Sequence, residues 1–253
     1  MSLLKTNAIT MQFGGLTAVN ELNLSIDQGE IVAVIGPNGA GKTTAFNMIT
    51  GVYTPTKGTI QFNDHDITGL KPHLITRQGM ARTFQNIRLF KDLTVEDNIF
   101  IAQHLHLKSN LYQAMFRLPG YQKEEKLILE KVTFLLEKVG LADLSQEKAS
   151  SLPYGLQRKL EIARALATDP QLLLLDEPAA GLNPKETSEL DQLILQLRDK
   201  HDISVLLIEH DMGLVMGISD HITVINQGAP LADGTPLEVR ENPDVIKAYL
   251  GES

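Results

Sequence analysis

The stretch IVAVIGPNGAGKTT, from Ile31 to Thr44, decides the fold. Its first five residues form an uninterrupted apolar run, which is typical of a strand buried on both faces of a parallel sheet. The residues that follow fit the pattern of a glycine, four residues and then Gly-Lys-Thr. A strand, a glycine-rich loop and a helix in this order predict a site that holds phosphate groups.

The predicted phosphate loop comprises Gly36, Pro37, Asn38, Gly39, Ala40, Gly41, Lys42, Thr43 and Thr44. Its glycines let successive backbone N–H groups curl around phosphate oxygens at a helix N-terminus, which already favours anions. Lys42 would reach the β- and γ-phosphates, and the hydroxyl of Thr43 would hold Mg²⁺. The alternative is a glycine-rich turn that matches by chance, and the strand-loop-helix setting disfavours it.

A second motif narrows the kind of phosphate chemistry. The run LLLLDEP, from Leu172 to Pro178, ends a predicted buried strand with two adjacent carboxylates. Because neighbouring side chains on a strand point to opposite faces, Asp176 and Glu177 cannot do the same job. Asp176 suits the shell of Mg²⁺, whereas Glu177 suits polarising an attacking water. The alternative makes Glu177 merely the first residue of a loop.

The remaining periodic segments predict an α/β protein. Val205 to His210 reads as another buried strand, and Thr187 to His201 reads as a helix with apolar residues at i, i+3, i+4 and i+7. Leu22 to Ile26 alternates apolar and polar residues, which predicts antiparallel strands in the N-terminal part. A last pair of helices is expected around Pro236 to Arg240 and Asp244 to Leu250.

A helical segment is expected from about residue 94 to residue 138. Thr94, followed three residues later by Asp97, is a helix-start signal. Pro119 and Gly120 are expected to break the helix. We therefore predict a helical subdomain inserted between two strands of the core.

Composition excludes several classes of function. The 253 residues include no cysteine, so disulfides, thiolate metal sites and thiol nucleophiles are excluded. The net charge of −8, with no cluster of Lys and Arg, disfavours nucleic acid as the main ligand. We expect neither a signal peptide nor a transmembrane segment, since no window approaches the roughly 18 apolar residues that cross a bilayer.

The motifs occur in the order found in the ATP-binding cassette (ABC) superfamily, which the chain resembles over nearly its whole length. Besides the phosphate loop, the resemblance rests on Gln85 in RTFQN, on Leu152 to Gln157 before RKLEIARAL, on DEPAAGLNP and on His210 in LLIEHD. The fold implied is the P-loop ATPase fold of this superfamily, with an antiparallel β part near the N-terminus. Residues 1–93 and 166–253 would form its core, and residues 94–165 its helical subdomain.

The resemblance implies roles for single residues. Phe13 stands where the superfamily has an aromatic ring that stacks on adenine; the alternative is an ordinary aromatic at a strand end. Gln85 resembles the residue that touches Mg²⁺ and the attacking water, and that links the site to a membrane partner. His210 resembles the residue that contacts the γ-phosphate and orients the water with Glu177. ATP and Mg²⁺ are the implied cofactors.

The superfamily signature departs from its usual form. In place of Leu-Ser-Gly-Gly-Gln, the chain has Leu152, Pro153, Tyr154, Gly155 and Leu156. In the superfamily this segment contacts the nucleotide bound by the partner cassette. Pro153 has neither a hydroxyl nor a backbone N–H, so two donors are lost at one position. Asn183 is a second departure, since it replaces an aspartate of the loop between the two sites.

The resemblance also implies partners. These are a second ABC ATPase in a head-to-tail dimer (a paralogue or the chain itself), transmembrane permease subunits and, indirectly, a substrate-binding protein. The chain would then lie at the cytoplasmic face of the inner (cell) membrane as a peripheral subunit that hydrolyses ATP.

Within the superfamily, the chain is similar to ATP-binding subunits of branched-chain amino acid importers. The similarity rests on FGGLTAVN, ARTFQNIRLFKDLTVEDN, a helical insertion around Leu105 to Gly120, DEPAAGLNPKE and NPDVIKAYLGE. Cassettes for urea uptake or lipopolysaccharide export share part of this pattern. A soluble ABC ATPase of translation or DNA repair and a non-catalytic nucleotide-binding regulator are further alternatives. The single phosphate loop and the absence of sustained heptads disfavour the former, and Glu177 disfavours the latter.

Overall fold

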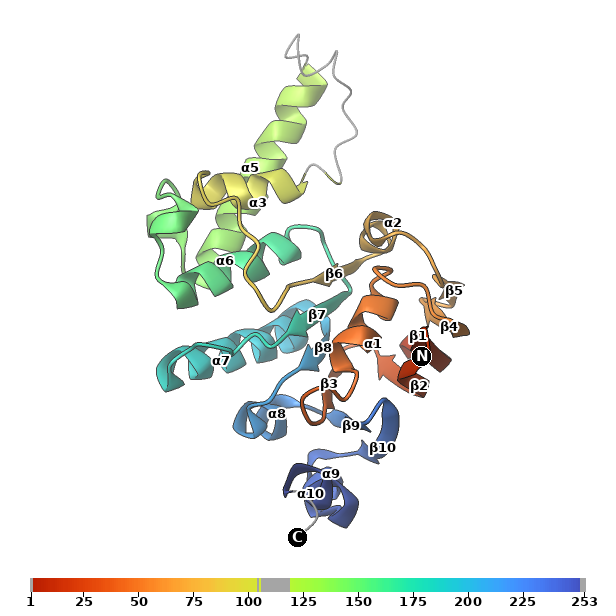
Figure 1. Cartoon of the computed structure of the whole chain (residues 1–253). Helices are drawn as coiled ribbons and strands as arrows, with labels where there is room; N and C mark the ends of the chain where they lie inside the picture. The colour runs from red at the N-terminus through yellow and green to blue at the C-terminus, as the bar shows by residue number, and fades with distance from the viewer. Residues whose placement is uncertain (1, 104, 106–118, 251–253) are drawn as a thin grey trace. The chain divides into compact units, whose positions relative to one another are not determined.

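The computed structural model describes residues 2–103, 105 and 119–250, which divide into two compact units (Figure 1). The first unit joins Met1–Gln85 to Gln171–Ser253, and the second is Asn86–Pro170. The helical subdomain expected at residues 94–165 lies within the range of the second unit.

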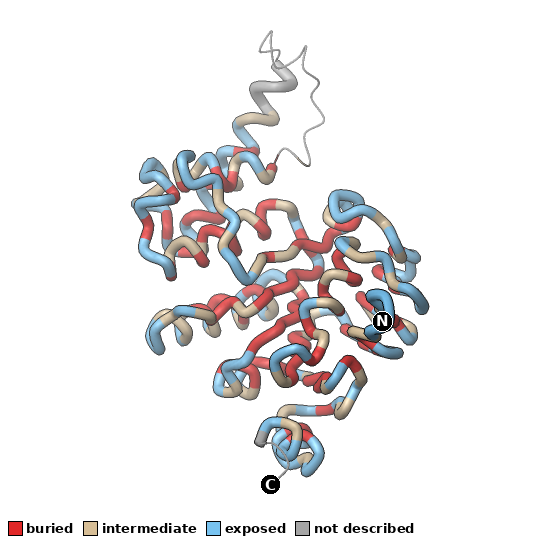
Figure 2. Tube along the Cα trace, viewed as in Figure 1, coloured by how far each residue is buried: buried red, intermediate tan, exposed pale blue. Residues whose placement is uncertain are grey.

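The first unit contains a six-stranded sheet that carries the predicted phosphate loop. Its strands, in the order β10-β9-β3-β8-β7-β6, are Ala229–Gly234, His221–Asn226, Ile31–Ile35, Ser204–Ile208, Leu172–Asp176 and Met80–Arg82. All neighbours pair in parallel except β10 with β9. The three central strands β3, β8 and β7 are buried along their whole length, as their apolar runs predict (Figure 2). The α/β prediction is confirmed.

One predicted strand end was wrong. Strand β8 ends at Ile208, so Glu209 and His210 lie beyond it. The reason is the Glu209 carboxylate, which is buried and accepts hydrogen bonds from the backbone N–H groups of Ala179 and His210. The backbone N–H of His210 is thus bonded to a side chain and not to a neighbouring strand, and the His210 side chain is exposed.

A second, antiparallel sheet confirms the prediction for the N-terminal part. Its strands, in the order β2-β1-β4-β5, are Leu16–Asp27, Ser2–Phe13, Lys57–Phe62 and His65–Asp66. Alternate residues of β2 are buried, and they share one hydrophobic core with the central strands and with Phe46 of helix α1 (Lys42–Ile49). This core anchors the helix that follows the phosphate loop.

The other helices of the first unit are α2 (Pro72–Arg77), α7 (Pro184–His201), α8 (Met212–Ile218), α9 (Pro236–Glu241) and α10 (Pro243–Leu250). Helix α7 buries Leu190, Leu193, Ile194 and Leu197, the face that its periodicity predicts.

The second unit is helical. It comprises α3 (Val95–Gln103), α5 (Pro119–Val139) and α6 (Tyr154–Leu166), with short 3₁₀ turns at Ala142–Leu144 and Ala149–Ser151. The predicted helix start at Thr94 is confirmed, because its hydroxyl accepts the backbone N–H of Asp97 at 3.0 Å. Pro119 begins α5, and Gly120 lies in its first turn. Most of the insertion expected around Leu105 to Gly120 lies outside the described residues. Nowhere in the described part of the chain is a helix long and apolar enough to span a bilayer.

Candidate nucleotide site

The phosphate loop leaves β3 and enters α1 through two positions that only glycine can occupy. Gly36 has φ 151°, and a Cβ there would lie 2.0 Å from the carbonyl oxygen of Ile225. Gly41, the residue before α1, has φ 104°, and its Cβ would lie 2.4 Å from the carbonyl oxygen of Ala18. The loop is therefore held close to two neighbouring strands, with the N-terminus of α1 at its end.

Lys42 lies buried inside the loop. Its Nζ donates to the carbonyl oxygens of Gly36 at 2.7 Å and Pro37 at 2.9 Å. Burial lowers the pKa of Lys42, whereas the charges of Glu177 and Asp176 raise it. The lysine thus lies in the field of both predicted carboxylates, although 134 residues separate it from the nearer one in the sequence.

Asp176 ends β7, and its carboxylate is buried. Its Oδ2 accepts a hydrogen bond from Nη2 of Arg82 at 2.7 Å, in a buried ion pair. Sequence reasoning missed Arg82, which lies on β6 three residues before Gln85.

Glu177 follows β7 in a left-handed conformation, with φ 48°. The side chains of Asp176 and Glu177 therefore diverge for a different reason from the one predicted: Glu177 is no longer part of the strand. Its backbone N–H still donates to the carbonyl oxygen of Ile208 at 2.8 Å. A non-glycine residue with positive φ costs about 1 to 3 kcal/mol, and such strain is concentrated at functional sites.

Two other predicted residues, Gln85 and His210, contact the Glu177 carboxylate. Nε2 of Gln85 donates to Oε2 of Glu177 at 2.7 Å, and Nε2 of His210 lies 2.6 Å from Oε1. All three line a cavity of about 430 Å³ whose floor is the phosphate loop. The described lining comprises Leu16, Thr17, Ala18, Asn38, Gly39, Ala40, Gly41, Lys42, Thr43, Thr44, Gln85, Glu177, His210, Gln227 and Gly228.

The donor set suits Mg²⁺ bound together with a nucleotide. Thr43 offers a hydroxyl at the start of α1, Asp176 offers carboxylate oxygens at the end of β7, and Gln85 offers an amide oxygen three residues after β6. Among the described residues, no cluster of three His, Cys, Asp or Glu side chains could hold a metal by itself. Mg²⁺ is commonly held by one or two protein oxygens, phosphates and waters, so this donor set fits it.

Phe13 lies at the end of β1, next to Tyr53. The two rings meet edge to face, with centroids 5.4 Å apart. The described lining of the cavity includes Leu16 on the same hairpin but not Phe13, whose ring is 44% exposed. Tyr53 was missed by sequence reasoning, since an aromatic residue in a loop carries no pattern of its own.

Tyr249 of α10 also approaches the loop. Burial raises the pKa of its phenol, and a hydrogen bond with the backbone of Gly36 lowers it. The C-terminal helix thus reaches the residue at which β3 becomes the phosphate loop.

The predicted signature residues lie at the start of α6 in the second unit. Pro153 is the N-cap of α6 and provides no side-chain cap, so the first donors of this helix are the backbone N–H groups of Tyr154 and Gly155. The hydroxyl of Tyr154 lies 3.3 Å from Nη2 of Arg158, which is buried and paired with Glu161 at 2.9 Å. Arg158 thus links the phenol of the first turn of α6 to a buried ion pair one turn farther along the helix.

Asn183 is the N-cap of α7. Its Oδ1 accepts the backbone N–H groups of Lys185 and Glu186, both at 3.0 Å, and Oε2 of Glu186 accepts the backbone N–H of Asn183. The side chain therefore has a local role at the helix start, whatever it contacts in an assembly.

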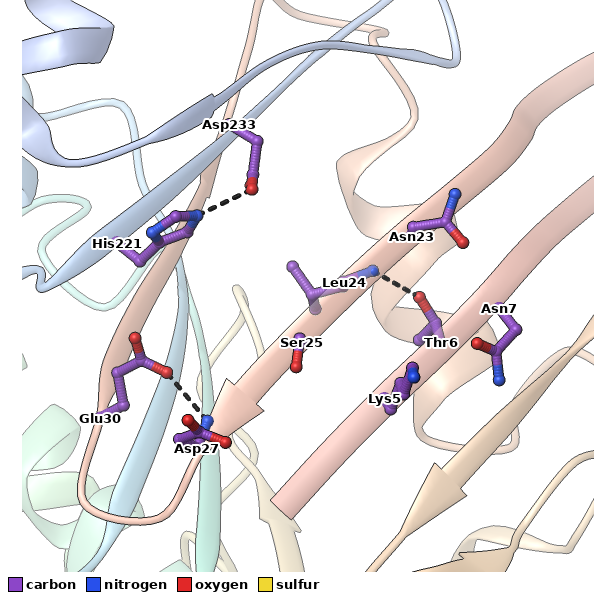
Figure 3. Close-up of a pocket in the computed structure, with 10 residues that line it drawn as sticks. All are labelled: Lys5, Thr6, Asn7, Asn23, Leu24, Ser25, Asp27, Glu30, His221 and Asp233. Atoms are coloured by element: carbon purple, nitrogen blue, oxygen red, sulfur yellow. Dashed lines mark hydrogen bonds and ion pairs between the residues drawn. The ribbon is translucent and has the colours of Figure 1, made fainter. Parts of the chain in front are cut away.

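A second cavity, of about 400 Å³, lies in the first unit between the antiparallel sheet and β9 (Figure 3). Its polar side chains bond to their own surroundings: Oγ1 of Thr6 accepts the backbone N–H of Leu24, and Nε2 of His221 lies 2.9 Å from Oδ2 of Asp233. None of the residues that line it belongs to the motifs, so we assign no function to it.

Two family models match parts of this chain. Residues 19–180 match the family model described as ABC transporter, and residues 229–253 match the model described as branched-chain amino acid ATP-binding cassette transporter. The chain is 55% identical to the high-affinity branched-chain amino acid transport ATP-binding protein BraF of Pseudomonas aeruginosa, over 99% of this chain and 98% of that protein.

Two further relatives extend the comparison. The chain is 54% identical to the high-affinity branched-chain amino acid transport ATP-binding protein LivG of Escherichia coli strain K12, over 99% of this chain and 98% of that protein. Among solved structures, it matches the ADP conformation of an ATP-binding cassette of an ABC transporter, with a TM-score of 0.86, 33% identity and full coverage of both chains.

Proposed function

This chain belongs to the ABC transporter family, and we propose that it is the ATP-hydrolysing subunit of an importer for branched-chain amino acids. The observation that carries the proposal is the Glu177 carboxylate, which Gln85 and His210 hold at the mouth of the phosphate-loop cavity. A carboxylate held in this way suits the orientation and deprotonation of a water that attacks a γ-phosphate.

The residues divide the chemistry among them. The backbone N–H groups of Gly39 to Thr43 and the ammonium of Lys42 bind the phosphates, and Phe13 stacks on the adenine. Thr43, Asp176 and Gln85 hold Mg²⁺, which neutralises negative charge on the phosphates when bound. Glu177 takes the proton of the attacking water, and His210 positions Glu177 and contacts the γ-phosphate.

The second unit acts on a neighbouring subunit. In a head-to-tail dimer with a second cassette, the start of α6 presents the backbone N–H groups of Tyr154 and Gly155 to the partner's γ-phosphate, and Asn183 lies at the interface. A charge-assisted hydrogen bond contributes about 1.5 to 3 kcal/mol, so the loss of one or two donors at Pro153 weakens this contact without abolishing it. The dimer drives permease subunits from the cytoplasmic face of the membrane.

The transported substrate rests on similarity. Relatives with 54% and 55% identity over nearly their full length are named for branched-chain amino acid transport, and the C-terminal residues 229–253 match a model specific to that transport. Because an ATPase subunit does not contact the cargo, the substrate is best tested in cells.

The experiment combines transport with phosphate release. In the native host, deletion of the gene should abolish high-affinity uptake of radiolabelled leucine, and the wild-type chain should restore it, whereas Lys42→Ala should not. Lys185→Ala, which changes an exposed lysine of α7, is the matched control. Normal leucine uptake in the deletion strain would refute the substrate, and a purified chain without Mg²⁺-dependent phosphate release, alone or with its partners, would refute the hydrolysis.

A further inference from the structure

Arg82 is the first residue of the RTFQN segment, and neither the motifs nor the proposed chemistry gives it a role. It is a largely buried arginine on β6, and its two terminal nitrogens contact three partners on two other elements. Nη2 donates to Oδ2 of Asp176 at 2.7 Å, at the end of β7. Nη1 donates to Oδ1 of Asn47 at 2.8 Å and to Oγ1 of Thr50 at 3.0 Å, on α1 and directly after it.

The guanidinium is also confined by aromatic rings. Its central carbon lies 5.6 Å from the ring centre of Phe46 and 5.1 Å from that of Phe84. Its Nε is buried and has no hydrogen-bond partner, so burying this N–H group costs free energy. Because a buried ion pair often stabilises a fold no more than well-packed apolar residues would, stability alone does not account for this arginine.

The three elements joined by Arg82 carry the predicted metal and phosphate groups. Helix α1 begins with Lys42 and Thr43, β6 leads to Gln85, and β7 ends at Asp176. Nη2 of Arg82 bonds Oδ2 of Asp176 and so restricts how this carboxylate can turn, and Asp176 would hold the metal together with Thr43 and Gln85. Groups that fix a metal ligand in this way typically change metal affinity by about 10- to 100-fold when they are removed.

We propose that Arg82 is a positioning residue. It holds the Asp176 carboxylate in the orientation that accepts Mg²⁺ with the nucleotide, and it fixes this carboxylate relative to α1 and to β6, the strand that leads to Gln85. This inference rests on the proposed function and deepens it. A lysine cannot replace the arginine, because one ammonium does not reproduce a planar fork that bonds Asp176 on one side and Asn47 and Thr50 on the other.

A role of Arg82 as a positive charge and a role as a positioning residue predict opposite effects of its removal on metal binding, so an experiment can separate them. If Arg82 acted mainly as a positive charge, it would repel Mg²⁺, and its removal would strengthen metal binding. If it acts by positioning, both Arg82→Lys, which keeps the charge, and Arg82→Gln, which removes it, weaken metal binding.

The test measures binding of a fluorescent ATP analogue to the purified full-length chain, first in EDTA and then during titration with Mg²⁺. For both variants we expect the half-saturating Mg²⁺ concentration to rise roughly tenfold, with metal-free affinity for the analogue within about twofold of wild type. Manganese binding measured by electron paramagnetic resonance in the presence of ADP gives a second readout that requires no turnover.

The control is Arg198→Gln, which removes another arginine–aspartate pair of the same unit, between Arg198 and Asp220. It should leave the metal titration unchanged. Folded Arg82 variants with an unchanged or lowered half-saturating Mg²⁺ concentration would overturn the inference, as would an equal loss of metal-free affinity. If the Arg82→Gln protein does not fold, the Mg²⁺ titration of the milder Arg82→Lys variant decides whether the inference holds. A wild-type chain whose nucleotide binding does not respond to Mg²⁺ would instead refute the proposed function.

Discussion

Two helix starts, that of α1 in the first unit and that of α6 in the second, present the same backbone feature in different surroundings. Neither has a side-chain cap, since the N-cap residues are Gly41 and Pro153. Each therefore offers unpaired backbone N–H groups and the positive end of a helix dipole to an anion.

The starts of α1 and α6 differ in the side chains that surround them. At α1, strands β6, β7 and β8 deliver charged and polar side chains to the loop, including the Glu177 carboxylate with Gln85 and His210. At α6, the first turn offers backbone donors and the phenol of Tyr154, which is tied to Arg158. A helix start alone thus offers a place for an anion, whereas at α1 other elements add the side chains to which we assign the proposed hydrolysis.

The largest expected effect comes from removing the reactive carboxylate at α1. Glu177→Gln should lower kcat for ATP hydrolysis by about 10²- to 10⁴-fold, the usual contribution of a general base, while ATP binding persists. Phosphate release and nucleotide binding, measured on the same preparation, check this. Glu189→Gln, which changes a half-buried glutamate of α7, should leave kcat unchanged. A Glu177→Gln protein that hydrolyses at the wild-type rate would place the base elsewhere.

The donors missing at α6 can be restored in two steps. Pro153→Ala returns a backbone N–H, and Pro153→Ser returns the N–H together with a hydroxyl. In the Glu177→Gln background, ATP-dependent association should strengthen in the order Pro, Ala, Ser, by about tenfold or more for each added donor, since such a donor contributes about 1.5 to 3 kcal/mol. Light scattering with and without Mg-ATP gives the affinities. An unchanged affinity in both variants would show that α6 does not contact the partner's phosphate.

The cap of α7 tests whether Asn183 has more than a local role. Asn183→Ala removes the acceptor of two backbone N–H groups, and should destabilise the chain by about 0.5 to 2 kcal/mol. Asn183→Asp keeps the cap and restores the charge usual in the superfamily. We expect the Asn183→Asp protein to have the wild-type Tm in thermal denaturation. It should differ from wild type only in ATP-dependent association. A loss of stability in Asn183→Asp equal to that of Ala would contradict the capping role.

The smallest expected effect concerns Asp191 on α7. Burial raises the pKa of Asp191, with further contributions from Asp211 and Glu209, and its Oδ1 is buried without a hydrogen-bond partner. Because the folded state holds the proton more tightly than the unfolded state, Asp191 makes stability fall as the pH rises from 3.8 through the folded pKa. Above that pKa the charged carboxylate lowers the free energy of unfolding by an amount that no longer changes with pH.

Asp191→Asn removes this cost. At about pH 7.5 its Tm should exceed that of wild type by roughly 1 to 3 °C, a small effect because the group is partly exposed and solvent screens its charge. The difference should shrink as the pH falls toward 3.8, the ordinary pKa of the group. Scanning calorimetry across this range provides the check, and a difference in Tm that stays constant with pH would contradict the ionisation account.

The sequence by itself determined the elements that depend on short stretches. The apolar runs Ile31–Ile35 and Leu172–Asp176 and the period of α7 each predicted a buried strand or helix face that the structure has. These predictions succeed because backbone geometry and burial leave their mark within a few residues. The resemblance to the ABC superfamily also implied that Gln85, Glu177 and His210 share one site, because their motifs occur in the order of that superfamily.

Tertiary structure alone decided how those side chains are held. Arg82 and Asp176 lie 94 residues apart in the sequence, and no local pattern links them. The left-handed conformation of Glu177 replaced the strand alternation expected there, and the buried Glu209 ended β8 two residues early. Such contacts form only when distant strands meet, because a buried charge is tolerated solely where the fold brings a partner to it.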